Sequence, residues 1–473
     1  MSIFSETRGF VVGAASSGTG KTAVASALCR LMRERGLTVQ PFKTGPDFID
    51  PTYLTLAAGR TCRNLDGFPC PDLTPFFYRD SCRASGTRAD IAVVEGVMGL
   101  YDGLGPEGLY STAWLARTLG LPVILTVDAR AAATSVAATV KGFASLEPLA
   151  PRLSGVIANR VSGADHAELI REAVMRYAGV PLIGWLPSIK DEGFRSRHLG
   201  LVPALEAKDA KAAQDRFTDA LRDNLDAEAL LSIAQEPSGV LVEPDLPRAV
   251  TKADGSPVRA AVADDDAFCF HYRENWELLR RLGAEVVTAS PVSDGSLPAG
   301  IDLLILPGGY PEEFAGELSS NGRFMKSVAD FSRRGCVYAE CGGMLYLAES
   351  MEYKGAVRKM CGVIPSCVKM TGHLRHFGYV EATAMRDSLI MERGGTIRAH
   401  EFHYSAVEGA EPNAFSVRKA SRPKENWTDG FVLEDGRLLA SYMHVNFYAR
   451  PEAAERMLLR AAAGNLSQDR SVF

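Results

Sequence analysis

The sequence lacks any apolar run long enough to cross a bilayer, and its N-terminus does not combine a basic head with an apolar segment. It also lacks an excess of positive charge, because the formal net charge is -5, which argues against a nucleic-acid-binding surface. The nine cysteines form no disulfide framework and have no zinc-site spacing. These absences predict a cytoplasmic protein with reduced thiols and without membrane or nucleic-acid partners, and nothing indicates its oligomeric state.

What is present is ordinary globular composition in a chain of 473 residues, which is too long for one ordinary domain. Short apolar runs alternate with helix-length segments, and this pattern predicts a parallel α/β sheet covered on both faces. The expected strands lie at 9–15, 37–43, 89–96, 121–128, 153–161 and 180–187, with helices at 22–36 and 134–146.

The pattern lapses at 235–260, where four prolines, two glycines and mixed charges are typical of a linker. A second α/β series follows, with strands expected at 259–265, 284–290, 302–309 and 335–341. The sequence therefore predicts an N-terminal domain at 1–235, a linker at 236–258 and a C-terminal domain at 259–473.

The stretch "GAASSGTGKTAV" (13–24) ends in Gly-Lys-Thr at a predicted strand-to-helix junction. The usual phosphate-loop pattern would place glycine where Ala15 stands, but alanine is the smallest substitute. Nucleotide binding is assigned to Gly18, Thr19, Gly20, Lys21 and Thr22. The glycines let backbone N–H groups turn toward an anion, Lys21 can reach the β/γ-phosphates, and the Thr22 hydroxyl can bind Mg²⁺. The alternative is an ordinary helix cap.

Acidic residues follow two further strands. Asp47 and Asp50 lie in "FKTGPDFIDP" (42–51), Glu95 ends a strand, and Asp102 comes shortly after it. Strand C-termini of a parallel sheet meet at one edge, so these groups should lie beside the phosphate loop. We assign Asp47, Glu95 and Asp102 to catalysis, and Thr22, Asp47 and Glu95 to Mg²⁺. A lone Asp after a strand is more often a helix cap or a solvated loop residue.

A second constellation lies in "ILPGGYPEEF" (305–314) and "VYAECGGMLYL" (337–347). Cys341 ends an apolar strand, and Gly-Gly and a helical run follow it, which is the layout of a nucleophile elbow. The helix N-terminus is expected to lower the thiol pKa. Gly308 and Gly309 can supply N–H donors to an oxyanion, and His444, after another apolar strand, is the candidate base.

Two His-x-x-His pairs, "HLRH" (373–376) and "HEFH" (400–403), have strand-like flanks. On a strand such spacing points the two side chains to opposite faces. We therefore favour core or substrate-lining histidines over a metal site.

In order along the chain, "SSGTGKT", "FKTGPDFIDP", "RNLDGF", "VVEGVMGLYDG", "RHLGLVPA", "LPGGYPE", "YAECGGMLYL", "HEFHYS" and "SYMHVNF" resemble the cobyrinate a,c-diamide synthase family of cobalamin biosynthesis. The resemblance implies a dethiobiotin-synthetase-like P-loop domain and a class I-type glutaminase domain. It implies that ATP phosphorylates carboxylates c and a of a corrinoid, and that ammonia from glutamine displaces the phosphate. It also implies an adenine contact at Asn159, and Cys341 and His444 as nucleophile and base.

Close relatives of that family act on hydrogenobyrinate or Ni-sirohydrochlorin, and both stay open as substrates. Cobyric acid synthase activity, or a non-catalytic P-loop partner with a relic glutaminase, are further alternatives. A relic would be expected to have lost some of Lys21, Glu95, Cys341 and His444. Class I glutaminases usually carry Glu two residues after the catalytic His, where this sequence has Asn446, so the group that orients His444 stays open.

Overall fold

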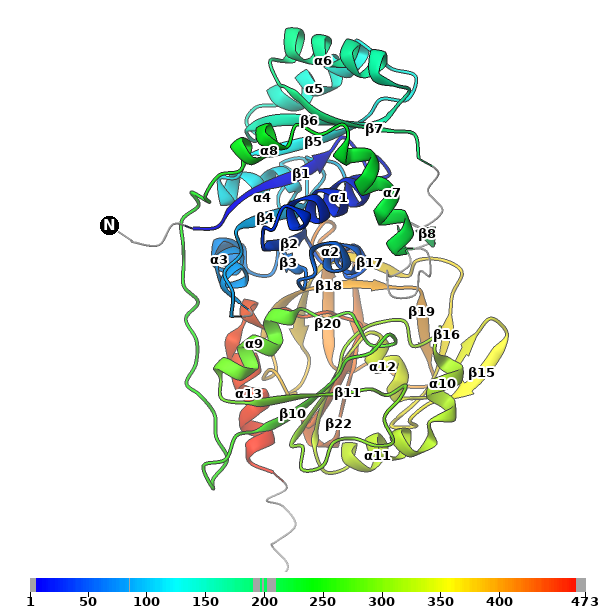
Figure 1. The fold of residues 1–473 in the computed structure, drawn as a ribbon. Coiled ribbons are helices and arrows are strands. Elements are labelled where there is room, and N and C mark those ends of the chain that lie inside the picture. The colour runs from blue at the N-terminus through cyan, green and yellow to red at the C-terminus, as the bar shows by residue number, and fades with distance from the viewer. Residues whose placement is uncertain (1–5, 85, 190–195, 198–199, 202–209, 465–473) are drawn as a thin grey trace, which may run out of the picture. The chain divides into compact units, whose positions relative to one another are not determined.

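The computed structural model describes residues 6–84, 86–189, 196–197, 200–201 and 210–464. The chain forms two compact units, Met1–Pro244 and Asp245–Phe473 (Figure 1). The division falls inside the segment 236–258 that the sequence predicts as a linker. Most of the "RHLGLVPA" stretch (197–204) lies outside the described residues. The prediction of two α/β domains is confirmed.

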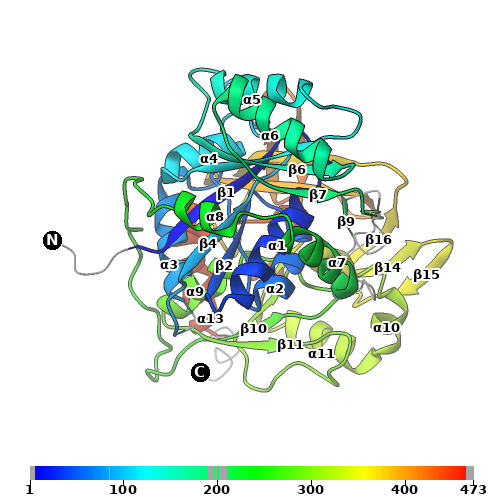
Figure 2. The ribbon, with the colours of Figure 1, turned by 45° about the horizontal axis from the view of Figure 1, so that its top comes forward.

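Unit 1 is built on a seven-stranded parallel sheet with the order β3-β2-β4-β1-β5-β6-β7 (Figures 1 and 2). Its strands are β1 (Arg8–Ala14), β2 (Val39–Thr44), β3 (Arg63–Leu65), β4 (Ile91–Glu95), β5 (Val123–Asp128), β6 (Leu153–Val161) and β7 (Leu182–Pro187), with a separate short pair β8 (Ser196–Arg197) and β9 (Gly200–Leu201). Its helices are α1 (Lys21–Glu34), α2 (Asp50–Ala58), α3 (Thr74–Arg83), α4 (Thr112–Leu119), α5 (Ser135–Ser145), α6 (Ala164–Ala178), α7 (Ala210–Arg222) and α8 (Ala227–Ile233).

Both faces of this sheet are buried, which is why its strands read as continuous apolar runs. Phe10 and Val12 of β1 pack in one core with α1, α2 and α7. On the other face, Gly9 and Gly13 let Tyr78 of α3 and Leu100, in the segment after β4, approach the strand closely. All six predicted strands and both predicted helices of this domain are present within a few residues of their expected bounds.

Unit 2 contains a six-stranded sheet with the order β11-β10-β12-β13-β23-β22, in which only β22 is antiparallel. These strands are β10 (Arg259–Ala263), β11 (Glu285–Ala289), β12 (Leu303–Leu306), β13 (Cys336–Glu340), β22 (Phe431–Leu433) and β23 (Leu438–Ser441). The helices of the unit are α9 (Arg273–Arg281), α10 (Ala315–Ser320), α11 (Gly322–Ser332), α12 (Gly342–Leu347) and α13 (Pro451–Ala462).

Two four-stranded sheets complete unit 2. The first has the order β15-β14-β16-β19 and consists of β14 (Ala348–Tyr353), β15 (Ala356–Lys359), β16 (Ile364–Met370) and β19 (Ser405–Glu408). The second has the order β18-β17-β20-β21 and consists of β17 (His376–Ala384), β18 (Thr396–His403), β20 (Phe415–Lys419) and β21 (Asn426–Asp429). β18 contains the whole 400–403 histidine motif, whereas only His376 of the 373–376 motif lies in β17 and residues 373–375 precede that strand. The expected strand conformation is therefore confirmed for 400–403 and for the residues after His376, but not for 373–375.

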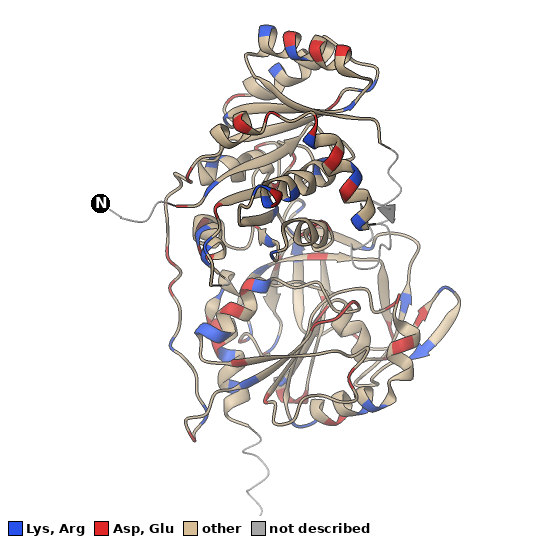
Figure 3. Ribbon diagram, in the orientation of Figure 1, with Lys and Arg blue, Asp and Glu red and all other residues tan. Residues whose placement is uncertain are grey.

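Charges of both signs alternate along the surface helices. Figure 3 shows acidic and basic residues interspersed on α6 and α7, so neither helix presents a run of one sign. Within the described residues, no helix is both long and apolar enough to span a membrane.

Candidate active sites

The phosphate loop connects β1 to α1 and is held in shape by its own polar groups. Thr19 Oγ1 donates to the Ser16 carbonyl (2.9 Å), and Asn159 Nδ2 donates to the Thr19 carbonyl (2.9 Å). Gly20, at φ 98°, begins the helix, and a Cβ there would lie 2.4 Å from Asn159 Nδ2. Position 20 therefore requires glycine for both its backbone angle and its contact.

Lys21 is buried at the start of α1 and points back across the loop. Its Nζ donates to the carbonyls of Met98 (2.5 Å) and Ser16 (3.3 Å). Burial, and secondarily the charge of Lys43, lower the pKa of Lys21 to about 8. An ammonium whose hydrogen bonds go only to carbonyl oxygens is suited to bind an anion.

Lys43 is a site residue that the sequence analysis missed. Its side chain is 2% exposed, and its Nζ lies 2.5 Å from Asp50 Oδ2, 3.0 Å from Glu95 Oε1 and 3.5 Å from Asp47 Oδ2. Burial disfavours its charge, but the three carboxylates outweigh burial and hold the pKa of Lys43 well above its usual value. β2 and β4 place it there, because Lys43 and Glu95 are register partners.

The predicted acidic residues near the phosphate loop differ in burial and in their hydrogen-bond partners. Glu95 is fully buried and accepts a hydrogen bond from Thr22 Oγ1 (2.8 Å), and burial raises its pKa to about 7. Asp47 Oδ1 accepts from the N–H groups of Ile49 and Asp50, so this residue also stabilises the turn that leads into α2. Asp102 is exposed and accepts from Gly99 N (2.9 Å) within the loop that follows β4.

A hollow of about 490 Å³ lies beside the phosphate loop, at the carboxyl ends of β5 and β6. Arg160, Ser162 and His166 are among its lining residues. Arg160 Nη2 donates to the Gly18 carbonyl (3.0 Å), so a residue that lines the hollow also contacts the phosphate loop. Asn159 directs its side chain to the loop, with Oδ1 accepting from Arg160 N (2.9 Å).

Cys341 stands at a sharp turn between β13 and α12, as the sequence predicts. Its backbone angles are φ 42° and ψ -106°, a strained conformation of the kind found at nucleophile elbows. Gly343 allows the turn, since a Cβ there would lie 2.1 Å from the Leu306 carbonyl oxygen. The expected lowering of the thiol pKa is wrong: burial, and secondarily Glu312, raise it, and the Gly342 N–H offsets them only in part.

His444 lies three residues beyond β23, which is the neighbour of β13 in the sheet. Cys341 N donates to the Ser441 carbonyl (2.7 Å), which brings both catalytic candidates to one sheet edge. His444 Nδ1 lies 3.7 Å from Glu340 Oε2. Burial lowers the pKa of His444 to about 4, so its imidazole is neutral at neutral pH.

Glu340, immediately before the candidate nucleophile Cys341, is the second residue that the sequence analysis missed. Its Oε1 accepts from the Tyr338 hydroxyl (2.8 Å) and from Val445 N (3.0 Å). Asn446, which occupies the usual place of the orienting acid, instead accepts from Tyr448 N (3.0 Å) and caps a short turn. A carboxylate beside the cysteine in "YAECGG" is the sequence feature that could have indicated Glu340.

Gly308 and Gly309 lie against the same pair. A Cβ on Gly308 would lie 2.3 Å from His444 Cε1, and a Cβ on Gly342 would lie 3.0 Å from Gly309 N. The backbone after β12 therefore passes directly beside His444 and the residue that follows Cys341. From the other side, the Phe402 carbonyl oxygen of β18 lies 3.9 Å from Cys341 Sγ.

Both domains match known families. Residues 10–194 match the CobQ/CobB/MinD/ParA nucleotide binding domain, and residues 259–452 match the CobB/CobQ-like glutamine amidotransferase domain. The cobyrinate a,c-diamide synthase of Salmonella typhimurium is 40% identical over 463 residues, which cover 96% of this chain and 98% of that protein. The chain belongs to the cobyrinate a,c-diamide synthase family.

Other members of the cobyrinate a,c-diamide synthase family are similarly close. The cobyrinate a,c-diamide synthase of Listeria innocua is 39% identical over 455 residues and covers 94% of this chain and 98% of its own length. The hydrogenobyrinate a,c-diamide synthase of Streptomyces coelicolor is 41% identical over 488 aligned positions, covering 95% of this chain and 96% of that protein. The resemblance stated from the sequence motifs is thus confirmed.

Proposed function

We propose that this chain amidates the c and then the a carboxylate of cobyrinate, using ATP and glutamine. The observation that carries the proposal is the presence in one chain of a phosphate-loop site and a Cys–His site, in a family whose members bear this name. Hydrogenobyrinate is the second candidate substrate, since the Streptomyces coelicolor relative is named for it. The reaction is that of a carbon–nitrogen ligase.

In the synthetase half, a substrate carboxylate oxygen attacks the γ-phosphorus of ATP, and ADP leaves. Ammonia then attacks the carbonyl carbon of the acyl phosphate, loses a proton and expels phosphate. Lys21 and the N–H groups of residues 18–22 would stabilise charge on the transferring phosphoryl group, which is most of catalysis in such reactions. Lys43 keeps the neighbouring carboxylates from repelling the incoming anions.

The acidic residues fit a magnesium ion. Glu95 Oε2 is buried and accepts no hydrogen bond from the described residues, while Oε1 is already bonded to Thr22 and Lys43. Such an orphaned carboxylate oxygen beside a hydroxyl matches the oxygen ligands that Mg²⁺ prefers. We assign Thr22, Glu95 and Asp47 to the ion, which when bound would neutralise charge on the β- and γ-phosphates.

The hollow beside Arg160 is our candidate for the nucleoside. It adjoins the phosphate loop through the Arg160–Gly18 hydrogen bond, so a nucleotide bound to the loop can extend into it. Asn159 donates one amide N–H to the Thr19 carbonyl, and we propose that its other N–H donates to an adenine.

In the glutaminase half, His444 takes the proton of the Cys341 thiol as sulfur attacks the glutamine side-chain amide. The N–H groups near Gly308 and Gly309 would hold the oxyanion, and ammonia leaves with a proton from His444. Water then hydrolyses the glutamyl thioester to glutamate. Because burial keeps the resting thiol protonated, this scheme needs the base and nucleophile to act together.

We assign Glu340 as the positioning residue for His444. Its carboxylate is fixed by Tyr338 and Val445 and lies 3.7 Å from Nδ1, so in this proposal Nε2 is the nitrogen that transfers the proton. A carboxylate there stabilises the imidazolium that forms during attack, as the third member of a triad does. In this proposal Glu340 takes the place of the acid that is absent at position 446.

Competition between macrocycles tests the substrate assignment. Purified chain, ATP and glutamine would be given equal amounts of cobyrinate, hydrogenobyrinate and Ni-sirohydrochlorin, with products resolved by mass spectrometry. Cobyrinate should be consumed first, with a monoamide preceding the diamide. Faster amidation of hydrogenobyrinate or Ni-sirohydrochlorin would move the assignment to that macrocycle.

A further inference from the structure

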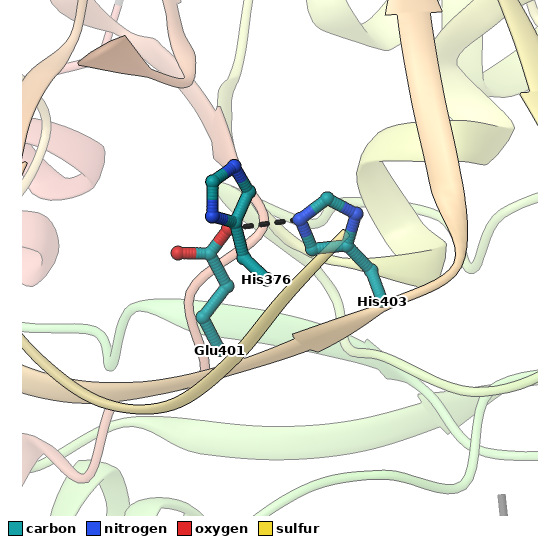
Figure 4. Close-up of side chains that lie close together, drawn as sticks. All are labelled: His376, Glu401 and His403. Atoms are coloured by element: carbon teal, nitrogen blue, oxygen red, sulfur yellow. Dashed lines mark hydrogen bonds and ion pairs between the residues drawn. The ribbon is translucent and has the colours of Figure 1, made fainter. Parts of the chain in front are cut away.

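A cluster of three ligand-type side chains lies on β17 and β18, outside the catalytic groups. One nitrogen each from His376 and His403 and one oxygen from Glu401 all lie within 4.8 Å of one another (Figure 4). His376 and His403 are direct cross-strand partners, and Glu401 lies two residues from His403 on the same face. The cluster thus takes one histidine from each His-x-x-His motif, a combination that spacing within either motif does not reveal.

The proton on His403 Nδ1 determines whether Nε2 can bind a metal ion. His403 Nδ1 lies 2.9 Å from the Ser405 carbonyl oxygen, which can only accept a hydrogen bond, so Nδ1 carries the proton. The lone pair of Nε2 then faces Glu401 Oε1 at 2.9 Å. Two acceptors at this distance require a proton or a cation between them. A histidine whose far nitrogen donates to a carbonyl is also the usual arrangement around protein-bound metals.

The surroundings fix these side chains in place. Trp427 stacks on His376 with ring centroids 4.1 Å apart, and Tyr442 stacks on His403 at 3.5 Å. Glu401 is fully buried, and although burial raises its pKa and the nearby Trp427 N–H lowers it in part, its Oε2 has no partner in hydrogen-bond geometry among the described residues. His376 is only half-buried, which leaves one open side for a water ligand. A buried, rigid and unsatisfied carboxylate between two imidazoles costs free energy unless a further group binds it.

We propose that His376, Glu401 and His403 bind a divalent transition-metal ion, with zinc as the best match. Two imidazoles and one carboxylate are borderline ligands that suit zinc, whereas Mg²⁺ and Ca²⁺ prefer all-oxygen sites. The ion would tie β17 to β18, the strand whose Phe402 carbonyl lies beside Cys341. Its role would be structural, at the wall of the glutaminase site.

The test is metal binding by the full-length chain, without substrates. The apo protein would be titrated with Zn²⁺ and with Co²⁺, whose visible absorption reports nitrogen and oxygen ligands, and zinc content would be measured after gel filtration. We compare the parent with His376→Ala and Glu401→Gln. The control is His373→Ala, which removes an exposed histidine of the same motif that lies outside the cluster.

The parent and His373→Ala should each bind about one zinc ion and show a zinc-dependent rise in Tm. His376→Ala and Glu401→Gln should bind zinc at least about tenfold more weakly and lose that rise. Excess Mg²⁺ should not compete. A parent without stoichiometric zinc, or variants that bind zinc as the parent does, would overturn the site and leave a proton shared by Glu401 and His403.

Discussion

Replacing Glu340 with glutamine removes one negative charge beside His444 and leaves the side-chain shape almost unchanged. The amide oxygen of glutamine can still accept the hydrogen bonds from the Tyr338 hydroxyl (2.8 Å) and from Val445 N (3.0 Å). Glu340→Gln should therefore fold, and the expected change is confined to the glutaminase reaction.

The size of the loss follows from the 3.7 Å between Glu340 Oε2 and His444 Nδ1. When His444 becomes an imidazolium, unit charges at that separation attract by about 4.5 kcal/mol at an effective dielectric constant of about 20. That energy corresponds to about three orders of magnitude in rate. Because two hydrogen bonds already delocalise charge from the carboxylate, we expect kcat/KM for glutamine hydrolysis to fall by about 100- to 1000-fold.

The pH profile separates an orienting charge from a merely structural role. Burial raises the pKa of Glu340 to about 7, and only the ionised carboxylate stabilises the imidazolium. Glutamine hydrolysis should therefore rise as pH increases through about 7 and fall below it, and Glu340→Gln should lack this limb. Tyr338→Phe removes a hydrogen bond that lowers the pKa of Glu340, so it should move the limb to higher pH.

Glutamate release, measured across pH, gives kcat and KM for each variant. Amidation with ammonium chloride, which bypasses glutamine, is the matched control and should keep its parental rate in Glu340→Gln. The reasoning is refuted if Glu340→Gln hydrolyses glutamine within about threefold of the parent, or if its acidic limb is unchanged. Parallel loss of ammonia-dependent amidation would instead indicate damage to the fold.

Four further variants test the two sites. Lys21→Ala should lose about a thousandfold in amidation with either nitrogen source while still hydrolysing glutamine, and parental amidation would contradict the phosphate-loop assignment. Glu95→Gln should likewise lose product and keep glutaminase activity, and the reverse result would remove it from the synthetase site. Cys341→Ser should lose glutamine-dependent amidation by about a thousandfold, with product restored by ammonium chloride at raised pH, and unchanged use of glutamine would exclude Cys341 as nucleophile. Lys43→Met should lower the free energy of unfolding in urea by about 3 kcal/mol, because it leaves buried carboxylates unpaired, and a change below about 1 kcal/mol would contradict that electrostatic role.

Apolar runs were sufficient to predict the central strands, since these are buried on both faces. The helix predicted at 22–36 is α1, Lys21–Glu34, and the strand predicted at 335–341 is β13, Cys336–Glu340. β3 escaped prediction because it has only three residues, two of them polar. The sheets after residue 348 were anticipated only at the histidine motifs, because half-exposed antiparallel strands lack continuous apolar runs.

Sequence reasoning missed Lys43 and Glu340 because pairing between strands brings each of them to its site. In the sequence, nothing distinguishes Lys43 from a solvent-exposed lysine. Only the register of β2 with β4 shows that it lies beside Glu95. Glu340 reaches His444 because β13 pairs with β23, more than ninety residues later in the chain. The expected low thiol pKa of Cys341 failed for a related reason, because sequence does not reveal how completely a side chain is buried.

Amidation of cobyrinate with amide-¹⁵N glutamine tests the central claim most directly. The purified chain would be incubated with ATP, Mg²⁺, cobyrinate and labelled glutamine, and the corrinoid would be followed by mass spectrometry. The account predicts a singly labelled monoamide followed by a doubly labelled diamide, formed only when ATP is present, with one ADP and one glutamate released per amide. A corrinoid that gains no label while ATP and glutamine are both consumed, or label gained without ATP, would contradict it.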